Sequence, residues 1–137
     1  MILITPFARA QESASWKVSL GKKNILTSSS EDTSKNLISI KKADLTNNGM
    51  FKIEYTEPKN SATKGWVRTI ALMDTNSTVV AQRDSTSSLQ FYNKDILKIL
   101  WSRKKVNLFT WAAPADPAMA AAIRIRRQLL CTIVLAD

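Results

Sequence analysis

Histidine is absent from this 137-residue chain, and its single cysteine is Cys131. The lack of histidine removes the commonest general base and the commonest transition-metal ligand of proteins. Cys131 lies in the apolar run Leu-Leu-Cys-Thr-Ile-Val-Leu, which is typical of a buried, unreactive thiol. Zinc, copper and haem sites of the usual kinds therefore have no ligand set, and we predict neither a metal nor another cofactor.

Carboxylates are the remaining candidates for acid–base chemistry, as the pairs Glu54 with Glu57 and Asp74 with Asp84. Glu54 alternates with lysine on the polar side of a predicted strand, and turn chemistry explains both aspartates. The chain has no Gly-rich phosphate loop, no Gly-x-Ser-x-Gly elbow and no Cys-x-x-Cys pair. We therefore predict that the protein is not an enzyme.

Basic residues are the strongest chemical signal, with 20 Lys and Arg against 11 Asp and Glu and a net charge of +9. Such a balance favours anionic partners, although charges at strand ends and turns also serve as an ordinary solvated surface. If the clusters converge near tryptophan, they form a surface that suits nucleic acid or an anionic glycan. The candidate residues for this anion or partner surface are Arg103, Lys104, Lys105, Arg124, Arg126, Arg127, Trp66 and Trp101.

Residues 93–135 contain two copies of one plan, namely a short helix, a basic patch and an apolar β-type run. In the first copy Asn93 is a predicted helix cap, and the predicted apolar face consists of Ile96, Leu97, Leu100 and Trp101. In the second copy Asp116 caps a helix and Pro117 suits its first position. Each copy is expected to be a packed helix that leads through basic residues into a buried strand.

The end of the second helix has two interpretations. Arginine and glutamine are good helix formers, so the helix can continue through Arg127. We favour a strand from Ile123, because Ile123 and Ile125 alternate with Arg124 and Arg126. That alternation places the isoleucines in the core and the arginines on the polar face of a strand.

Alternating apolar and polar residues predict strands through most of the remaining chain. The clearest alternation is at 50–56, and we expect this strand to form a hairpin with 36–41 through a turn at Asn48-Gly49 that favours positive φ. Residues 66–73 and 78–83 form a second predicted hairpin. Frequent turns and two brief helices indicate a mainly β fold, an antiparallel β-sandwich or partly open barrel, as a single domain over 11–137.

The N-terminal residues 1–10 end in Ala8-Arg9-Ala10, a small-x-small cleavage pattern before Gln11. They are interpreted either as the remnant of a signal peptide or as a β-strand over 2–4. No stretch approaches the roughly 18 uninterrupted apolar residues that a membrane span needs, so no span is expected. The export interpretation predicts a secreted or periplasmic protein, and the alternative is cytoplasmic.

These observations lead to two hypotheses for function. The first is an exported, non-enzymatic β-sandwich of the cell envelope that binds or assembles with another protein or an anionic envelope polymer such as a glycan. The alternative is a basic module that binds nucleic acid. A homo-oligomer formed by pairing of strand edges remains open in either case.

Overall fold

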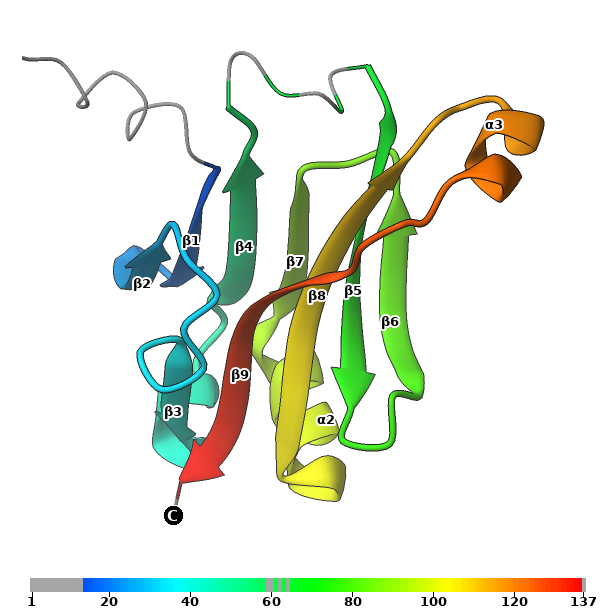
Figure 1. Ribbon diagram of the computed structural model, residues 1–137. Coiled ribbons are helices and arrows are strands. Elements are labelled where there is room, and N and C mark those ends of the chain that lie inside the picture. Colours follow the sequence, from blue (N-terminus) through cyan, green and yellow to red (C-terminus); the bar gives the residue numbers. More distant parts are fainter. Residues whose placement is uncertain (1–13, 59–60, 62, 64, 137) are drawn as a thin grey trace, which may run out of the picture.

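The computed structural model describes residues 14–58, 61, 63 and 65–136, which form two β-sheets and two short α-helices (Figure 1). The mainly β class with two short helices is therefore confirmed. The four-stranded antiparallel sheet has the order β2 (Lys23–Ser28), β1 (Ser15–Leu20), β4 (Met50–Thr56) and β7 (Ser88–Tyr92). The five-stranded sheet has the order β3 (Leu37–Lys41), β9 (Gln128–Ala136), β8 (Lys105–Ala113), β5 (Val67–Asp74) and β6 (Val79–Asp84). Within it β3 is parallel to β9, and the other pairs are antiparallel.

The two sheets share one hydrophobic core, as in a sandwich. Phe51 and Ile53 of β4 are fully buried, whereas the lysine and glutamate between and after them lie at half-exposed positions. Leu72 of β5 and Leu108 of β8 contribute to the same core from the second sheet. Because successive side chains of a strand point to opposite faces, the alternation seen in the sequence selects the face that each strand buries.

A buried hydrogen bond joins the two sheets. Trp16 of β1 donates its indole N–H to the carbonyl oxygen of Leu130 at 2.8 Å. The register between β8 and β9 shifts after Leu108, so Leu130 faces no residue of β8. A β-bulge thus leaves a backbone carbonyl that the tryptophan of the other sheet satisfies.

The hairpins illustrate which pairings local sequence specifies. The predicted pairing of 66–73 with 78–83 is confirmed, since β5 and β6 are antiparallel neighbours joined by a tight turn. The predicted hairpin of 36–41 with 50–56 is wrong, because β3 pairs with β9 and β4 pairs with β1 and β7. Between β3 and β4 the 3₁₀ helix η1 (Lys42–Leu45) buries Leu45 and carries the chain from one sheet to the other.

The first predicted helix is α2 (Asn93–Arg103), but two of its details differ from expectation. Its N-cap is Tyr92, whose side chain makes no capping hydrogen bond, and Asn93 is a buried first-turn residue. The buried face consists of Asn93, Ile96 and Leu100, so Trp101 is 55% exposed rather than packed. The core under α2 is filled by two aliphatic side chains, which leaves the tryptophan outside.

The second helix, α3 (Pro117–Ala122), has the predicted start, because the Asp116 carboxylate accepts the Ala118 N–H at 3.0 Å. The predicted strand from Ile123 is wrong, since residues 123–127 have no regular structure and β9 begins at Gln128. Ile123 and Ile125 are 40% and 38% exposed, so neither belongs to the core. No residue of α3 is buried either, so only the first copy of the repeated plan is a packed helix.

Candidate functional site

The two predicted basic clusters lie toward opposite ends of β8 (Figure 1). Residues 103–105 form the junction of α2 and β8, whereas residues 124–127 precede β9. In the ladder between β8 and β9, Lys105 pairs with Val134 and Thr110 with Gln128. Five residues of strand correspond to about 17 Å, so the clusters do not form one surface.

The first cluster surrounds the exposed ring of Trp101. The ammonium group of Lys42 lies 4.6 Å from the ring centroid and that of Lys104 lies 4.8 Å from it. Both distances are within the range of cation–π attraction. The tryptophan therefore fixes two lysines from different elements, η1 and the end of α2, at neighbouring surface positions.

Further lysines extend this group along α2. Lys94, Lys98 and Trp101 are spaced by four and three residues, so they lie along one face of the helix. A shallow hollow of about 250 Å³ lies among these three residues, Lys42 and Leu97. Within the described part of the chain, the three lysines of this hollow form no salt bridge.

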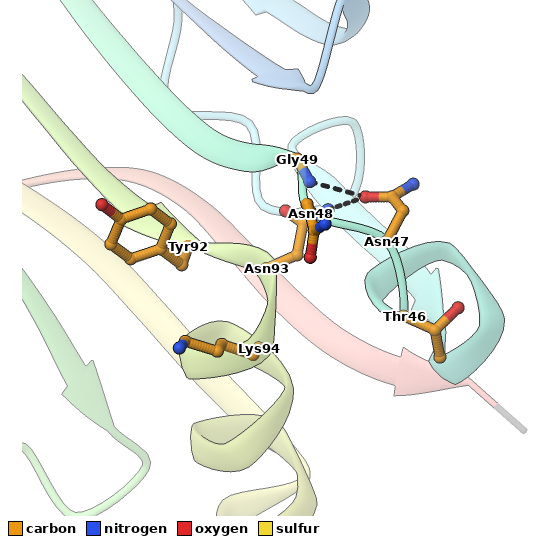
Figure 2. Close-up of a pocket in the computed structure, with 7 residues that line it drawn as sticks. All are labelled: Thr46, Asn47, Asn48, Gly49, Tyr92, Asn93 and Lys94. Carbon is orange, nitrogen blue, oxygen red and sulfur yellow. Dashed lines mark hydrogen bonds between the residues drawn. The ribbon is translucent and has the colours of Figure 1, made fainter.

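A second hollow of about 260 Å³ lies at the N-terminus of α2, next to the first (Figure 2). Lys94 lines both hollows. The residues that line the second are Thr46, Asn47, Asn48, Gly49, Tyr92, Asn93 and Lys94. Residues with amide, hydroxyl, phenol and ammonium groups therefore line one hollow.

The loop after η1 is attached to α2 by a set of hydrogen bonds shown in part in Figure 2. Asn47 Oδ1 accepts the Gly49 N–H at 2.9 Å and the Asn93 amide at 2.6 Å. The Asn93 N–H donates to the Gly49 carbonyl at 3.0 Å. Because the Gly49 N–H fixes which atom of Asn47 is the oxygen, it also fixes the orientation of Asn93. The opposite atom, Asn93 Oδ1, is buried without a donor among the described residues.

We call the exposed surface of the two hollows the α2 face, defined by Lys42, Asn48, Tyr92, Lys94, Lys98, Trp101 and Lys104. It combines four lysines with the N-terminus of α2, where the helix dipole is positive and Tyr92 makes no side-chain cap. Tyr92 is 58% exposed, and Lys94 lies 5.8 Å from its ring centroid. Such a surface can hold a negatively charged ligand that also carries hydroxyl groups.

Two arginines of the second basic cluster, Arg126 and Arg127, contact other side chains of the protein. Arg126 donates to the carboxylate of Glu31, which also accepts the Leu129 N–H at 2.9 Å. Arg127 lies 4.2 Å from the Phe109 ring centroid on the five-stranded sheet. Arg124 and Trp66 instead line a separate cavity. Of the predicted site residues, the structure thus brings Trp101 together with Lys104, and Trp66 with Arg124 and Arg126.

Sequence reasoning missed the polar part of the α2 face. The spacing of Lys94, Lys98 and Trp101 was a usable signal, but Trp101 was interpreted as part of the packed face. The contribution of Asn48 had no signal, because an Asn-Asn-Gly sequence is ordinary turn chemistry. Its place beside Tyr92 depends on how η1 and α2 contact each other.

The candidate acid–base residues have ordinary partners. Glu54 forms salt bridges with Lys17 and Lys52 at 3.8 and 3.6 Å. Asp84 accepts hydrogen bonds from Thr69 at 2.7 Å and from Gln82 at 3.2 Å. These contacts account for the carboxylates as parts of the sheet surfaces.

Cys131 is fully buried, and burial raises the pKa of its thiol far above the usual range, so it stays protonated at neutral pH. Across the described residues, no group of three or more Cys, Asp and Glu side chains is placed to hold a metal ion.

No family model, curated protein sequence or solved structure matches this chain. None of the helices in the described ranges has both the length and the apolar character that crossing a bilayer requires.

Proposed function

We propose that this protein is a non-enzymatic binding module that holds an acidic glycan on the α2 face. The observation that carries the proposal is the exposed Trp101 between Lys42 and Lys104, continuous through Lys94 with a hollow lined by amide and hydroxyl groups. The lysines supply attraction for carboxylate or sulfate groups. Asn48 and Thr46, both exposed, supply donors and acceptors for sugar hydroxyls.

Hydrogen bonds between the loop and α2 give this surface a fixed shape. Asn93 and Asn47 attach the loop to α2 before any ligand arrives, so little conformational entropy is lost when a ligand binds. Asn93 acts as a positioning residue in this scheme.

Binding of nucleic acid is the second candidate function, supported by the same group of lysines. Proteins that bind single strands stack bases on free aromatic faces. Here two ammonium groups lie within 5 Å of the Trp101 ring centroid. Their position over the ring favours a ligand that is held by charge and hydroxyl contacts over one held by stacked bases.

Calorimetric titration with an oligogalacturonate, which carries one carboxylate per sugar, tests the proposal. The double variant Lys94→Gln/Lys98→Gln should weaken binding by about three- to tenfold, because each exposed charge contributes modestly. The matched control Lys22→Gln/Arg83→Gln removes the same charge from other exposed positions and should change affinity by less than about twofold.

Two further ligands separate the candidate functions. The methyl ester of the same oligosaccharide keeps the sugars without the charge and should bind much more weakly. Equal binding of the ester, or an equal loss in the control variant, would show that the proposal is wrong. A single-stranded oligonucleotide that displaces the oligogalacturonate at far lower concentration would favour the nucleic-acid function.

The proposal includes export to the cell envelope, which is motivated by the Ala8-Arg9-Ala10 pattern. These residues lie outside the described ranges. Protein isolated from its native source should begin at Gln11, as measured by N-terminal sequencing. A source protein that keeps residues 1–10 would contradict export.

A further inference from the structure

A cavity of about 370 Å³ lies near the end of β8 that is remote from the α2 face. We call it the Arg124 cavity, and its walls include Trp66, Trp111, Arg68, Arg124 and Ile125. The two tryptophans are half-buried, and Ile125 is 38% exposed. A planar apolar group therefore has large surfaces to pack against.

The floor of the cavity is held in place by hydrogen bonds and stacking. Arg68 lies 4.1 Å from the Tyr55 ring centroid and donates to the Thr110 hydroxyl at 2.8 Å. The Thr110 hydroxyl donates to the Thr69 carbonyl at 2.7 Å. Tyr55 in turn donates to the side-chain oxygen of Gln128 at 3.3 Å. The arginine is thereby fixed rather than free to turn toward solvent.

Charge in the cavity is not balanced by the described residues. Three guanidinium groups line it, those of Arg68, Arg124 and Arg126. Two carboxylates pair with them, Glu57 with Arg68 at 3.3 Å and Glu31 with Arg126. Arg124 forms no salt bridge with any described residue. One positive charge is therefore left for a ligand.

The wall of the cavity also contains a buried donor. The Nε–H of Arg68 has no acceptor among the described residues and is shielded from solvent, although the residue lines the cavity. A buried donor without an acceptor costs free energy, so this side of the cavity is incompletely satisfied by the described residues. Arginine is also the side chain whose planar fork best matches a carboxylate.

We propose that the Arg124 cavity binds an aromatic carboxylate, with its ring between the tryptophan and isoleucine walls and its charge on Arg124. The inference is independent of the α2 face, because the two sites lie toward opposite ends of β8 and share no lining residue. The carboxylate can belong to a free small acid or to the carboxyl terminus of a peptide that ends in an aromatic residue.

Titration with phenylacetate, followed by the indole N–H resonances in ¹H–¹⁵N spectra, tests this proposal. The chain has four tryptophans, which serve as internal reporters. The signals of Trp66 and Trp111 should shift, with a dissociation constant of about 1 mM or lower. The signals of Trp16 and Trp101 should stay in place. Phenylacetamide, which has the same shape without the charge, should bind at least about tenfold more weakly.

The variant Arg124→Gln should weaken phenylacetate binding by at least about tenfold and leave phenylacetamide binding unchanged. Arg83→Gln on β6 is the matched control and should behave as the unmodified protein. Absence of shifts at Trp66 and Trp111, equal affinity for the amide, or an unchanged Arg124→Gln variant would each overturn the proposal. Because Arg124 is exposed in an irregular segment, the variant should keep the fold, and its unchanged Trp16 signal verifies this.

The source of the carboxylate is decided by N-acetyl-phenylalanine in the same titration. Tighter binding than phenylacetate indicates a peptide terminus, and weaker binding indicates a free acid. Both results support the proposed chemistry, whereas failure of both ligands contradicts it. A failure here would leave oligogalacturonate binding at the α2 face unaffected.

Discussion

Gly49 is required for space and not for its backbone freedom. The sequence predicted a positive φ at Asn48-Gly49, but among the described residues the glycines with positive φ are Gly21 and Gly65. A Cβ atom added at Gly49 would lie 2.9 Å from Asn47 Oδ1 and 3.0 Å from Asn93 Nδ2. Those atoms form the hydrogen bond that joins the loop to α2, so the glycine makes room for it.

We expect Gly49→Ala to lower the free energy of unfolding by about 1–3 kcal/mol, because the added methyl group forces the two asparagines apart. Urea denaturation measures this change. The same variant should also weaken oligogalacturonate binding, since the hollow at the N-terminus of α2 loses its shape. Asn48→Ala, an exposed neighbour, should reduce binding with little effect on stability, and an equal loss of stability in both variants would contradict this explanation.

Glu31 connects the loop after β2 to the segment before β9. Burial raises the pKa of its carboxyl group, but the hydrogen bonds from Arg126 and the Leu129 N–H, together with the positive charge of Arg126, bring the net pKa below the usual value. A carboxylate whose pKa is depressed by folding stabilises the protein above its unfolded pKa, and this contribution disappears as the pH falls through the folded pKa.

The variant Glu31→Gln should therefore lose part of the pH dependence of stability. In urea denaturation between about pH 6 and pH 3, the unmodified protein should become less stable as the pH falls, and the variant should do so with a smaller slope. Arg126→Gln should act in the same direction, because it removes one of the groups that lower the pKa. Identical slopes in all three proteins would refute the role of Glu31.

At the scale of elements, the end of α2 contains a strained residue that also belongs to the α2 face. Lys104 has φ 68° and ψ −33°, and its N–H closes the helix by donating to the Leu100 carbonyl at 2.7 Å. A side chain in this region of backbone space is unfavourable, and glycine is the residue that helices usually place there. Lys104 therefore lowers the stability of the protein at this position, but it contributes a positive charge beside Trp101.

We expect Lys104→Gly to raise the free energy of unfolding by about 0.5–1 kcal/mol and at the same time to weaken oligogalacturonate binding. Thermal unfolding and calorimetry measure the two effects. Lys105→Gly, one residue later at the start of β8, should instead destabilise the protein, because glycine disfavours a strand. A destabilised Lys104→Gly variant would argue against strain at this position.

At the scale of the whole molecule, Trp16 holds the two sheets in register through its bond to Leu130. The variant Trp16→Phe keeps an aromatic ring but leaves the Leu130 carbonyl without its donor, and it should cost about 1–3 kcal/mol in urea denaturation. Trp101→Phe removes an indole from an exposed position and should change stability by less than about 0.5 kcal/mol. Similar losses in both variants would show that the bond between the sheets is unimportant.

The sequence by itself determined most of the strands, the face that each of them buries and the start of α3. The alternation through Phe51 and Ile53 specified a buried face, and Asp116 with Pro117 specified where α3 begins. These features depend on the period of a strand and on capping within a few residues. The short connection between β5, which ends at Asp74, and β6, which begins at Val79, likewise made their pairing a local property.

Only the tertiary structure decided which strands pair across long separations and which polar residues meet. The parallel pairing of Leu37 with Thr132 joins segments almost a hundred residues apart, and many partners satisfy the same alternation equally well. Ile123 and Ile125 alternate like strand residues, yet the segment before β9 crosses no core and leaves them exposed. The basic clusters can be found in the sequence, but in the structure they lie toward opposite ends of β8. Trp101 lies beside Lys42 of η1 and Lys104 at the end of α2, whereas Arg124 and Trp66 line a different cavity. A local sequence pattern indicates which side chains of a segment are buried and which are exposed. A binding site depends on contacts between segments that are distant in the sequence, and a local pattern carries no information about those contacts.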